Sequence, residues 1–200
     1  MITSPQIFSS QQRIMSALSF GFVDIDENGW LDVSNASSGS LFPKIKNAWN
    51  YSGENWEIVF EVIITGSGLT YNTVYASDPG AGGDKDTPAL QYEPALHNFK
   101  AYYSTDGSNW THNTQGTTEL SLNTPYFVKL AWDGTVLTLL ISTDGINWNT
   151  EGTTSVSTAM PTKHTKIQIG KYGSAIFECG KINILNSYIK IGDDVVWGNV

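Results

Sequence analysis

Apolar and polar residues alternate with a period of two along most of the chain. The alternating runs are rich in Val, Ile, Thr and aromatic residues, and they end at Gly, Asn, Asp or Pro. Because successive side chains of a strand point to opposite faces, this pattern predicts β-strands with one face toward a core. The expected strands are 20–25, 30–33, 56–65, 70–76, 99–104, 126–132, 136–142, 166–170, 175–178 and 182–191. Residues 88–96 have a loose helical period, and one short helix is an open interpretation there.

The clearest hairpin signal lies in residues 126–142. Asp133 and Gly134 separate two apolar runs and supply the positive φ angles that a type I′ turn requires. Short strands joined by tight turns predict an all-β sandwich or barrel. At 200 residues the chain fits a single domain, 1–200, in which residues 1–15 are a candidate N-terminal arm.

A seven-residue segment occurs twice. Residues 104–110 read Ser-Thr-Asp-Gly-Ser-Asn-Trp, residues 142–148 read Ser-Thr-Asp-Gly-Ile-Asn-Trp, and a Gly-Thr-Thr stretch follows each copy. The Asp carboxylate can accept hydrogen bonds from the amides of its own turn, while Gly takes the left-handed conformation. The segment resembles the Asp-box hairpin of sialidases, one residue shorter, and this favours a structural turn over ligand contact.

The formal charge of the chain is -8, and Arg13 is its one arginine. A phosphate-binding surface needs clustered Lys and Arg, so no nucleic-acid partner is expected. Cys179 is the one cysteine, which excludes an internal disulfide. Residues 1–19 lack a cationic start followed by an apolar run, and no apolar stretch approaches bilayer length. Neither a Sec-type signal peptide nor membrane insertion is therefore expected.

Residues 24–29 match the opening of a calcium loop, in which alternate oxygen ligands converge and a glycine permits a sharp turn. The candidate metal ligands are Asp24, Asp26, Asn28 and Asp32. The last position of such a loop needs a bidentate Glu, and this chain has Asn35 there. The flanking segments also predict paired strands, so an Asn-Gly hairpin and a Ca²⁺ site are both interpretations of the same residues.

A glycine-rich loop at 77–87 superficially matches a phosphate-binding loop. Asp84 separates Lys85 from the last glycine and places negative charge where phosphate would bind, so phosphate is improbable. The loop is interpreted as mobile, or as a cradle for sugar hydroxyls or Ca²⁺. The candidate ligand-binding residues are Tyr71, Tyr75, Asp78, Asp84, Asp86 and Tyr92.

The remaining aromatic residues are assigned mostly to the core, because a two-sheet fold needs many of them there. Trp56, Phe60, Phe127 and Phe177 are expected to be buried, and Trp132 fits either role. No Glu-x-Asp-x-x-Glu strand is present, which is the carboxylate arrangement of glycosidases on this type of sandwich. Glu57 and Glu61 share a strand face but are interpreted as solvated or hydrogen-bonded. No catalytic residue is assigned, and the chain is not expected to be an enzyme.

The C-terminal half carries a family resemblance. Residues 125–134 (Pro-Tyr-Phe-Val-Lys-Leu-Ala-Trp-Asp-Gly), followed by 142–148, resemble laminin G-like or concanavalin A-like domains. Residues 177–191, with Trp197, resemble the last strands of such domains in bacteriophage tail and other virion surface proteins. The resemblance implies an all-β, two-sheet antiparallel β-sandwich, a jelly roll of the concanavalin A-like lectin/glucanase type.

The same resemblance implies a domain displayed on a virion and assembled in the host cytoplasm. Three hypotheses follow: a non-enzymatic module for host attachment that binds a bacterial surface glycan, a structural decoration, fibre or adaptor without sugar binding, and a polysaccharide hydrolase. The implied partners are a glycan or other virion proteins, and the implied assembly is a homo-oligomer. Fold analogy alone does not establish any of these activities.

Overall fold

The computed structural model describes residues 25–33, 44–46, 53–66, 72–77, 85, 88–160, 166–172, 175–177 and 179–198. The candidate arm at 1–15 lies outside these residues and stays a prediction. The described strands are β1 (Trp30–Asp32), β2 (Lys44–Lys46), β3 (Trp56–Ile64), β4 (Asn72–Ser77), β5 (Ala89–Glu93), β6 (Asn98–Tyr103), β7 (His112–Gln115), β8 (Pro125–Trp132), β9 (Val136–Ser142), β10 (Asn149–Ser155), β11 (Lys166–Ile169), β12 (Lys171–Tyr172), β13 (Ala175–Ile176), β14 (Gly180–Ile191) and β15 (Asp194–Gly198).

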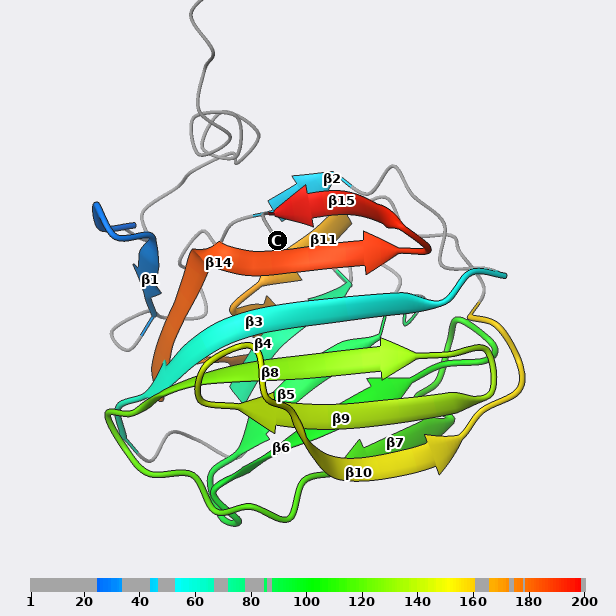
Figure 1. The fold of residues 1–200 in the computed structure, drawn as a ribbon, viewed down its shortest axis with the longest axis horizontal. Coiled ribbons are helices and arrows are strands. Elements are labelled where there is room, and N and C mark those ends of the chain that lie inside the picture. The colour runs from blue at the N-terminus through cyan, green and yellow to red at the C-terminus, as the bar shows by residue number, and fades with distance from the viewer. Residues whose placement is uncertain are drawn as a thin grey trace, which may run out of the picture.

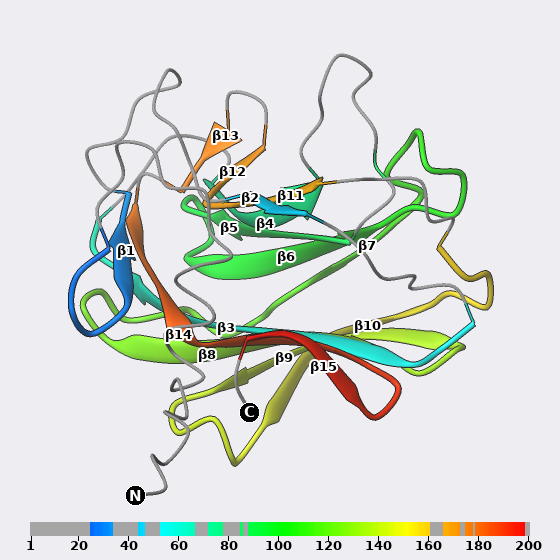
Figure 2. The same cartoon turned by 90° about the horizontal axis from the view of Figure 1, so that it is seen from above.

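Two antiparallel sheets face each other (Figures 1 and 2). The first is seven-stranded, with the order β1-β14-β3-β8-β9-β10 and with β15 paired to β14. The second is six-stranded, with the order β2-β11-β4-β5-β6-β7, and β12 and β13 form a separate ribbon. Among the described residues the protein has no helix, and so none with the length and apolar character to cross a bilayer. The expected all-β sandwich is confirmed.

The hairpin between β8 and β9 is confirmed, although its turn differs from the expected one. Trp132 pairs with Leu137, which leaves Gly134 and Thr135 as the central pair of the turn. Gly134 has φ +97°, whereas Thr135 is not among the residues with positive φ. Positive φ at the first central position alone is the type II′ pattern and not the type I′ pattern.

The segment 88–96 contains the strand β5 and the start of a turn, so the interpretation as a helix is wrong. β5 pairs with β4 on one side and with β6 on the other, and residues 94–97 form the turn into β6. Within β5 the side chains of Leu90 and Tyr92 are buried, whereas Gln91 between them is not. Pairing on both sides satisfies the backbone of β5 and overrides its weak helical periodicity.

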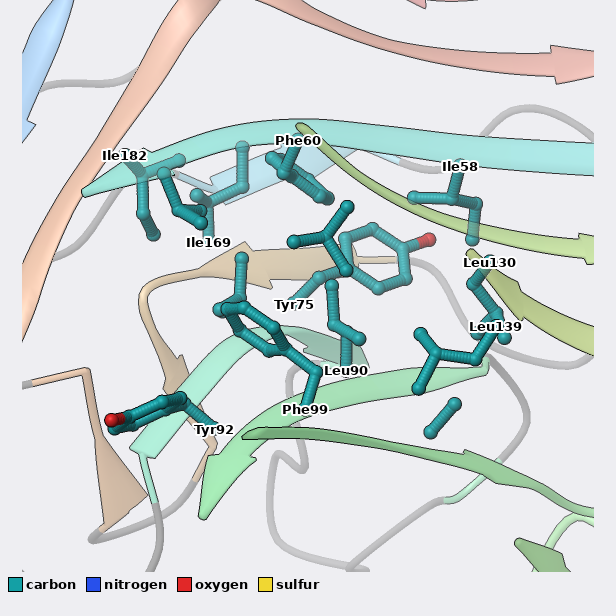
Figure 3. Packing of buried hydrophobic residues seen from close by; sticks show 14 of the residues in the cluster. Ile58, Phe60, Tyr75, Leu90, Tyr92, Phe99, Leu130, Leu139, Ile169 and Ile182 are labelled. Atoms are coloured by element: carbon teal, nitrogen blue, oxygen red, sulfur yellow. The ribbon is translucent and has the colours of Figure 1, made fainter. Parts of the chain in front are cut away.

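The core lies between the sheets and includes alternate residues of β3, β6, β8 and β9 (Figure 3). The even-numbered residues of β3, from Trp56 to Ile64, all face it. The rings of Phe60 and Tyr75 approach from opposite sheets with centroids 5.6 Å apart. Burial of Trp56, Phe60 and Phe177 is confirmed, and Trp132 belongs to the core, where its indole donates to the carbonyl of Val156 at 2.8 Å.

Phe127 is not a core residue. It alternates with Val128 and Leu130, which are buried between the sheets, so its side chain points to the outer face of the seven-stranded sheet and is half-buried there. The assignment of Phe127 to the core from its aromatic character was therefore wrong, because the parity of the strand decides which face a side chain occupies.

Both copies of the repeated segment form the same turn. In the second copy, between β9 and β10, the Oδ1 atom of Asp144 accepts the amides of Ile146 and Asn147, each at 2.8 Å. In the first copy, between β6 and β7, Asp106 accepts two amides in the same way, at 2.8 and 2.7 Å. The side-chain amide of the turn's Asn also donates to each Asp. That bond, followed by the two backbone bonds, holds the pKa of each Asp well below its usual value. The predicted turn architecture is confirmed.

Candidate functional site

The outer face of the seven-stranded sheet carries the candidate site. Odd-numbered residues of β3 point to this face, and Val59 lies between Tyr188 of β14 and Lys129 of β8 in the strand register. Val59 is only 1% exposed although it does not face the core. Its burial shows that neighbouring side chains cover the centre of this outer face.

A bulge in β14 builds one wall of the site. Asn183 pairs with Glu61 and Tyr188 pairs with Val59, so five steps along β14 match only two along β3. The Oδ1 atom of Asn183 accepts the amides of residues 185 and 186, at 3.0 and 3.3 Å, and closes the bulge. Bulges re-aim side chains, and this one places Leu185 and Asn186 beside the sheet face.

The second repeat turn builds the opposite wall. The β9–β10 connection lies in front of β8 in Figure 1 and projects away from the second sheet in Figure 2. A Cβ atom built on Gly145 would lie 3.4 Å from the ring of Phe127, so the turn rests closely on that ring. Trp148 follows the turn and is thereby placed over the sheet.

Four side chains between the walls form a connected cluster. The ammonium of Lys129 lies 4.1 Å from the ring centroid of Trp148 and 3.5 Å from a carboxylate oxygen of Glu57. The hydroxyl of Tyr188 donates to the other oxygen of Glu57 at 2.9 Å. Burial, then the hydrogen bond to Glu57 and its charge, raise the pKa of Tyr188 above its usual value. Tyr188 therefore stays protonated and acts as a hydrogen-bond donor at neutral pH.

Two hollows lie on this face, one on each side of the cluster. The Trp148 hollow has a volume of about 420 Å³, and the Gly192 hollow has a volume of about 250 Å³. The Trp148 hollow is lined by Val59, Phe127, Asp144, Gly145, Trp148, Leu185, Asn186 and Tyr188. The Gly192 hollow is lined by Asn55, Trp56, Glu57, Ala131, Trp132, Asp133, Val136, Thr138, Lys190 and Gly192.

The arrangement has the chemistry of a sugar-binding surface. Aromatic side chains offer apolar faces, while carboxylates and amides beside them offer polar atoms that fix the orientation of a ligand. Glu57 and Glu61, interpreted as hydrogen-bonded, do accept such bonds, from Tyr188 and from Asn186 at 2.7 Å. Four residue steps along β3 separate their Cα atoms by about 13 Å, which does not suit the carboxylate pair of a glycosidase.

The predicted binding face beside the glycine-rich loop is not supported. Tyr75 is fully buried and Tyr92 is 1% exposed, so both belong to the core and the prediction was wrong for them. Burial is the main cause that raises the pKa of Tyr92 to about 12. Tyr71, Asp78, Asp84 and Asp86 lie outside the described residues.

The described residues of the calcium-like motif, Asp26, Asn28 and Asp32, lie in the alternative hairpin. Ile25 bridges Leu31, and Asp26 accepts the amides of Asn28 and Trp30 at 2.9 and 3.0 Å. Asp32 forms an ion pair with Lys181 at 2.8 Å. The hairpin turn is confirmed over residues 25–31, and within the described part of the chain no three His, Cys, Asp or Glu side chains group to hold a metal. Asp24 lies outside that part, so calcium stays a prediction.

The alternation of residues in β8 could have located the site from the sequence, but Phe127 was assigned to the core because it is aromatic. Phe127, Lys129 and Ala131 share one parity in β8, while the more apolar Val128 and Leu130 share the other. That pattern places Phe127 on the outer face. The same parity places Phe127 and Lys129 side by side on the outer face of β8, which would have predicted a binding surface there.

Comparisons with known proteins give the fold. No family model matches the chain, and no curated protein sequence matches it. Among solved structures, it is similar to domains LG4-5 of the mouse laminin alpha1 chain, with a TM-score of 0.61 and 11% identity over 88% of this chain and 45% of that chain.

Two further solved structures resemble the chain. The CBM40 domain of the Ruminococcus gnavus IT-sialidase, bound to α2,3-sialyllactose, has a TM-score of 0.53 and 12% identity over 73% of this chain and 79% of that one. The enzymatically active domain of tailspike protein 2 of bacteriophage CBA120 has a TM-score of 0.51 and 13% identity over 76% of this chain and 24% of that one. The chain spans less than half of the laminin and tailspike chains. At these identities the likeness concerns the fold alone, and the chain has the laminin G-like β-sandwich fold.

Proposed function

We propose that this chain is a non-enzymatic glycan-binding module whose binding surface is the outer face of the seven-stranded sheet. The observation that carries the proposal is the position of Trp148, held over the sheet by Lys129 and flanked by Glu57, Tyr188 and Asn186. A sugar ring in the Trp148 hollow can pack against aromatic side chains while its hydroxyls donate to carboxylate oxygens.

The fold similarities support a binding role in general terms. One solved structure with this fold is a carbohydrate-binding domain crystallised with a sialylated sugar. Another is part of a phage tailspike. Together with the sequence resemblance to virion surface domains, these similarities support a proposal that the ligand is a bacterial surface glycan and that the chain is displayed on a virion as a homo-oligomer.

A glycan array of bacterial polysaccharides tests this proposal, with the wild-type chain and the variants Trp148→Ala and Trp110→Ala. Trp110 is the matched control, because it ends the first copy of the same turn and packs on Tyr102 at 5.8 Å, away from both hollows. We expect saturable binding that Trp148→Ala weakens by roughly tenfold or more and that Trp110→Ala leaves unchanged.

Three other outcomes are informative. Loss of binding in EDTA, with recovery on adding Ca²⁺, would assign calcium a role in the ligand site. If the folded wild-type chain binds no glycan but forms a stable oligomer or docks on another virion protein, the structural decoration or adaptor role replaces the glycan proposal. Equal weakening by both tryptophan variants would contradict the assignment of the Trp148 hollow.

A further inference from the structure

We propose that the ligand of this face is an uncharged, hydroxyl-rich, linear glycan that lies across both hollows, and that the face discriminates against glycans bearing carboxylates. This inference rests on the proposed function and names the class of sugar that the same surface would accept. It follows from the charges of the lining residues and from the position of Glu57 between the two hollows.

The lining is predominantly anionic. Glu57, Asp133 and Asp144 line the hollows, and Glu61 lies directly behind Asn186, to which it is hydrogen-bonded. Hydrogen bonds from the amides of their own turns hold the pKa values of Asp133 and Asp144 below the usual range. The carboxylates of Asp133 and Asp144 therefore remain ionised at all physiological pH values.

The cationic side chains offset only part of this charge for a ligand. Of the described residues that line the hollows, Lys190 alone is cationic, and it lies opposite Glu57 in the strand register. Lys129 is only 15% exposed, because its ammonium lies between the Trp148 ring and the Glu57 carboxylate. A ligand carboxylate would meet the acidic side chains of Glu57, Asp133 and Asp144 against the single ammonium of Lys190, whereas neutral hydroxyls can donate to those acidic groups.

The two hollows are adjacent parts of one surface. Glu57 lines the Gly192 hollow, and Tyr188, which donates to Glu57, lines the Trp148 hollow. Glu57 of β3 pairs with Ala131 of β8, which pairs with Thr138 of β9, so these three residues of the Gly192 hollow form a row across the outer face. A chain of sugars that follows the face from Trp148 toward Gly192 would pass over Glu57. A single sugar would occupy only one hollow.

Binding measured by titration calorimetry tests both parts of this inference. The probes are neutral oligosaccharides of increasing length, matched oligosaccharides that carry uronate or sialate, and de-N-acetylated amino-sugar oligomers. We expect the carboxylated probes to bind roughly tenfold or more weakly than neutral ones of equal length. This difference should shrink at high salt, because screening weakens repulsion between exposed charges.

The variant Thr138→Trp tests the length requirement, because it fills the Gly192 hollow without touching the Trp148 hollow. The control is Thr153→Trp, since Thr153 pairs with Thr138 in the neighbouring strand but lines neither hollow. We expect Thr138→Trp to lower the affinity of long neutral oligosaccharides to that of short ones and to leave short ones unchanged. Thr153→Trp should leave both unchanged.

The outcomes separate this inference from the proposed function. If no glycan binds, or if Trp148→Ala has no effect on binding, the proposed function fails. If binding depends on Trp148 but carboxylated or de-N-acetylated probes bind best, glycan binding stands and the uncharged class is overturned. If affinity does not rise with length, or if Thr138→Trp has no effect on long ligands, the ligand occupies one hollow and the two-hollow arrangement is overturned.

Discussion

The contact between Lys129 and Trp148 provides a direct test of how the site is held together. The change is Lys129→Met, which removes the ammonium but keeps an unbranched apolar stem of similar length. The ammonium of Lys129 lies over the indole of Trp148, so a Met, which keeps the unbranched chain without the ammonium, isolates the effect of the charge. The variant Lys129→Ala removes both the charge and the stem and serves as the comparison.

The expected magnitude follows from two contacts of the ammonium. A partly desolvated cation over a tryptophan ring contributes about 1 kcal/mol, and the ion pair with Glu57 at 3.5 Å contributes about 0.5 to 1 kcal/mol because Glu57 is 28% exposed. Glu57 keeps the hydrogen bond from Tyr188 in the variant, so no carboxylate is left without a partner. We expect Lys129→Met to lower the free energy of unfolding by about 1.5 to 2 kcal/mol.

Urea denaturation of a double-mutant cycle measures this contact. The cycle combines Lys129→Met with Trp148→Ala, and its coupling free energy isolates the interaction between the two side chains. We expect a coupling of about 1 kcal/mol with unchanged m-values. A coupling below about 0.3 kcal/mol would show that the ammonium does not stabilise the indole, and the account of the Trp148 position would be refuted.

Three further predictions concern the core, a close backbone approach and the repeat turns. Tyr75→Ala should lower the free energy of unfolding by about 3 to 5 kcal/mol in urea denaturation, because the side chain is fully buried. Gly180→Ala should lower the melting temperature, since its Cβ would overlap a carbonyl of β3, while Gly66→Ala, with open space around it, should not. NMR titration should show the carboxyls of Asp106 and Asp144 still ionised below pH 3.8. Their stabilisation is complete above that ordinary pKa and is lost only as pH falls through the lower folded value. A carboxyl that titrates at pH 3.8 would contradict the hydrogen bonding of its turn.

The sequence was informative where strands are apolar on one face. β9 matches the predicted segment 136–142 from end to end, and β3 matches within one residue. β7 and β10 were not predicted, because both are dominated by polar residues and show no apolar alternation. As the last strands of their sheets, each pairs with one neighbour only, and backbone hydrogen bonds rather than burial define them.

The candidate site could not be assembled from sequence in the same way. Glu57 and Tyr188 are 131 residues apart and meet only because β14 pairs with β3 across a bulge. The direction of Trp148 depends on the turn that precedes it, and the same turn directs Trp110 toward Tyr102 in the other copy. A repeated motif therefore predicts the local backbone, while the sheet beneath it decides what its tryptophan contacts.

The floor of both hollows is made by strands in the middle of the seven-stranded sheet. β3 and β8 are each paired on both sides, so their backbone cannot open without breaking the sheet. A ligand on this face therefore binds the intact fold and not a locally unfolded form. Its binding free energy adds to the stability of the whole sandwich, by an amount that grows with the logarithm of ligand concentration once the site is saturated. Heat resistance measured at rising ligand concentration would thus report affinity directly, without a label on either partner.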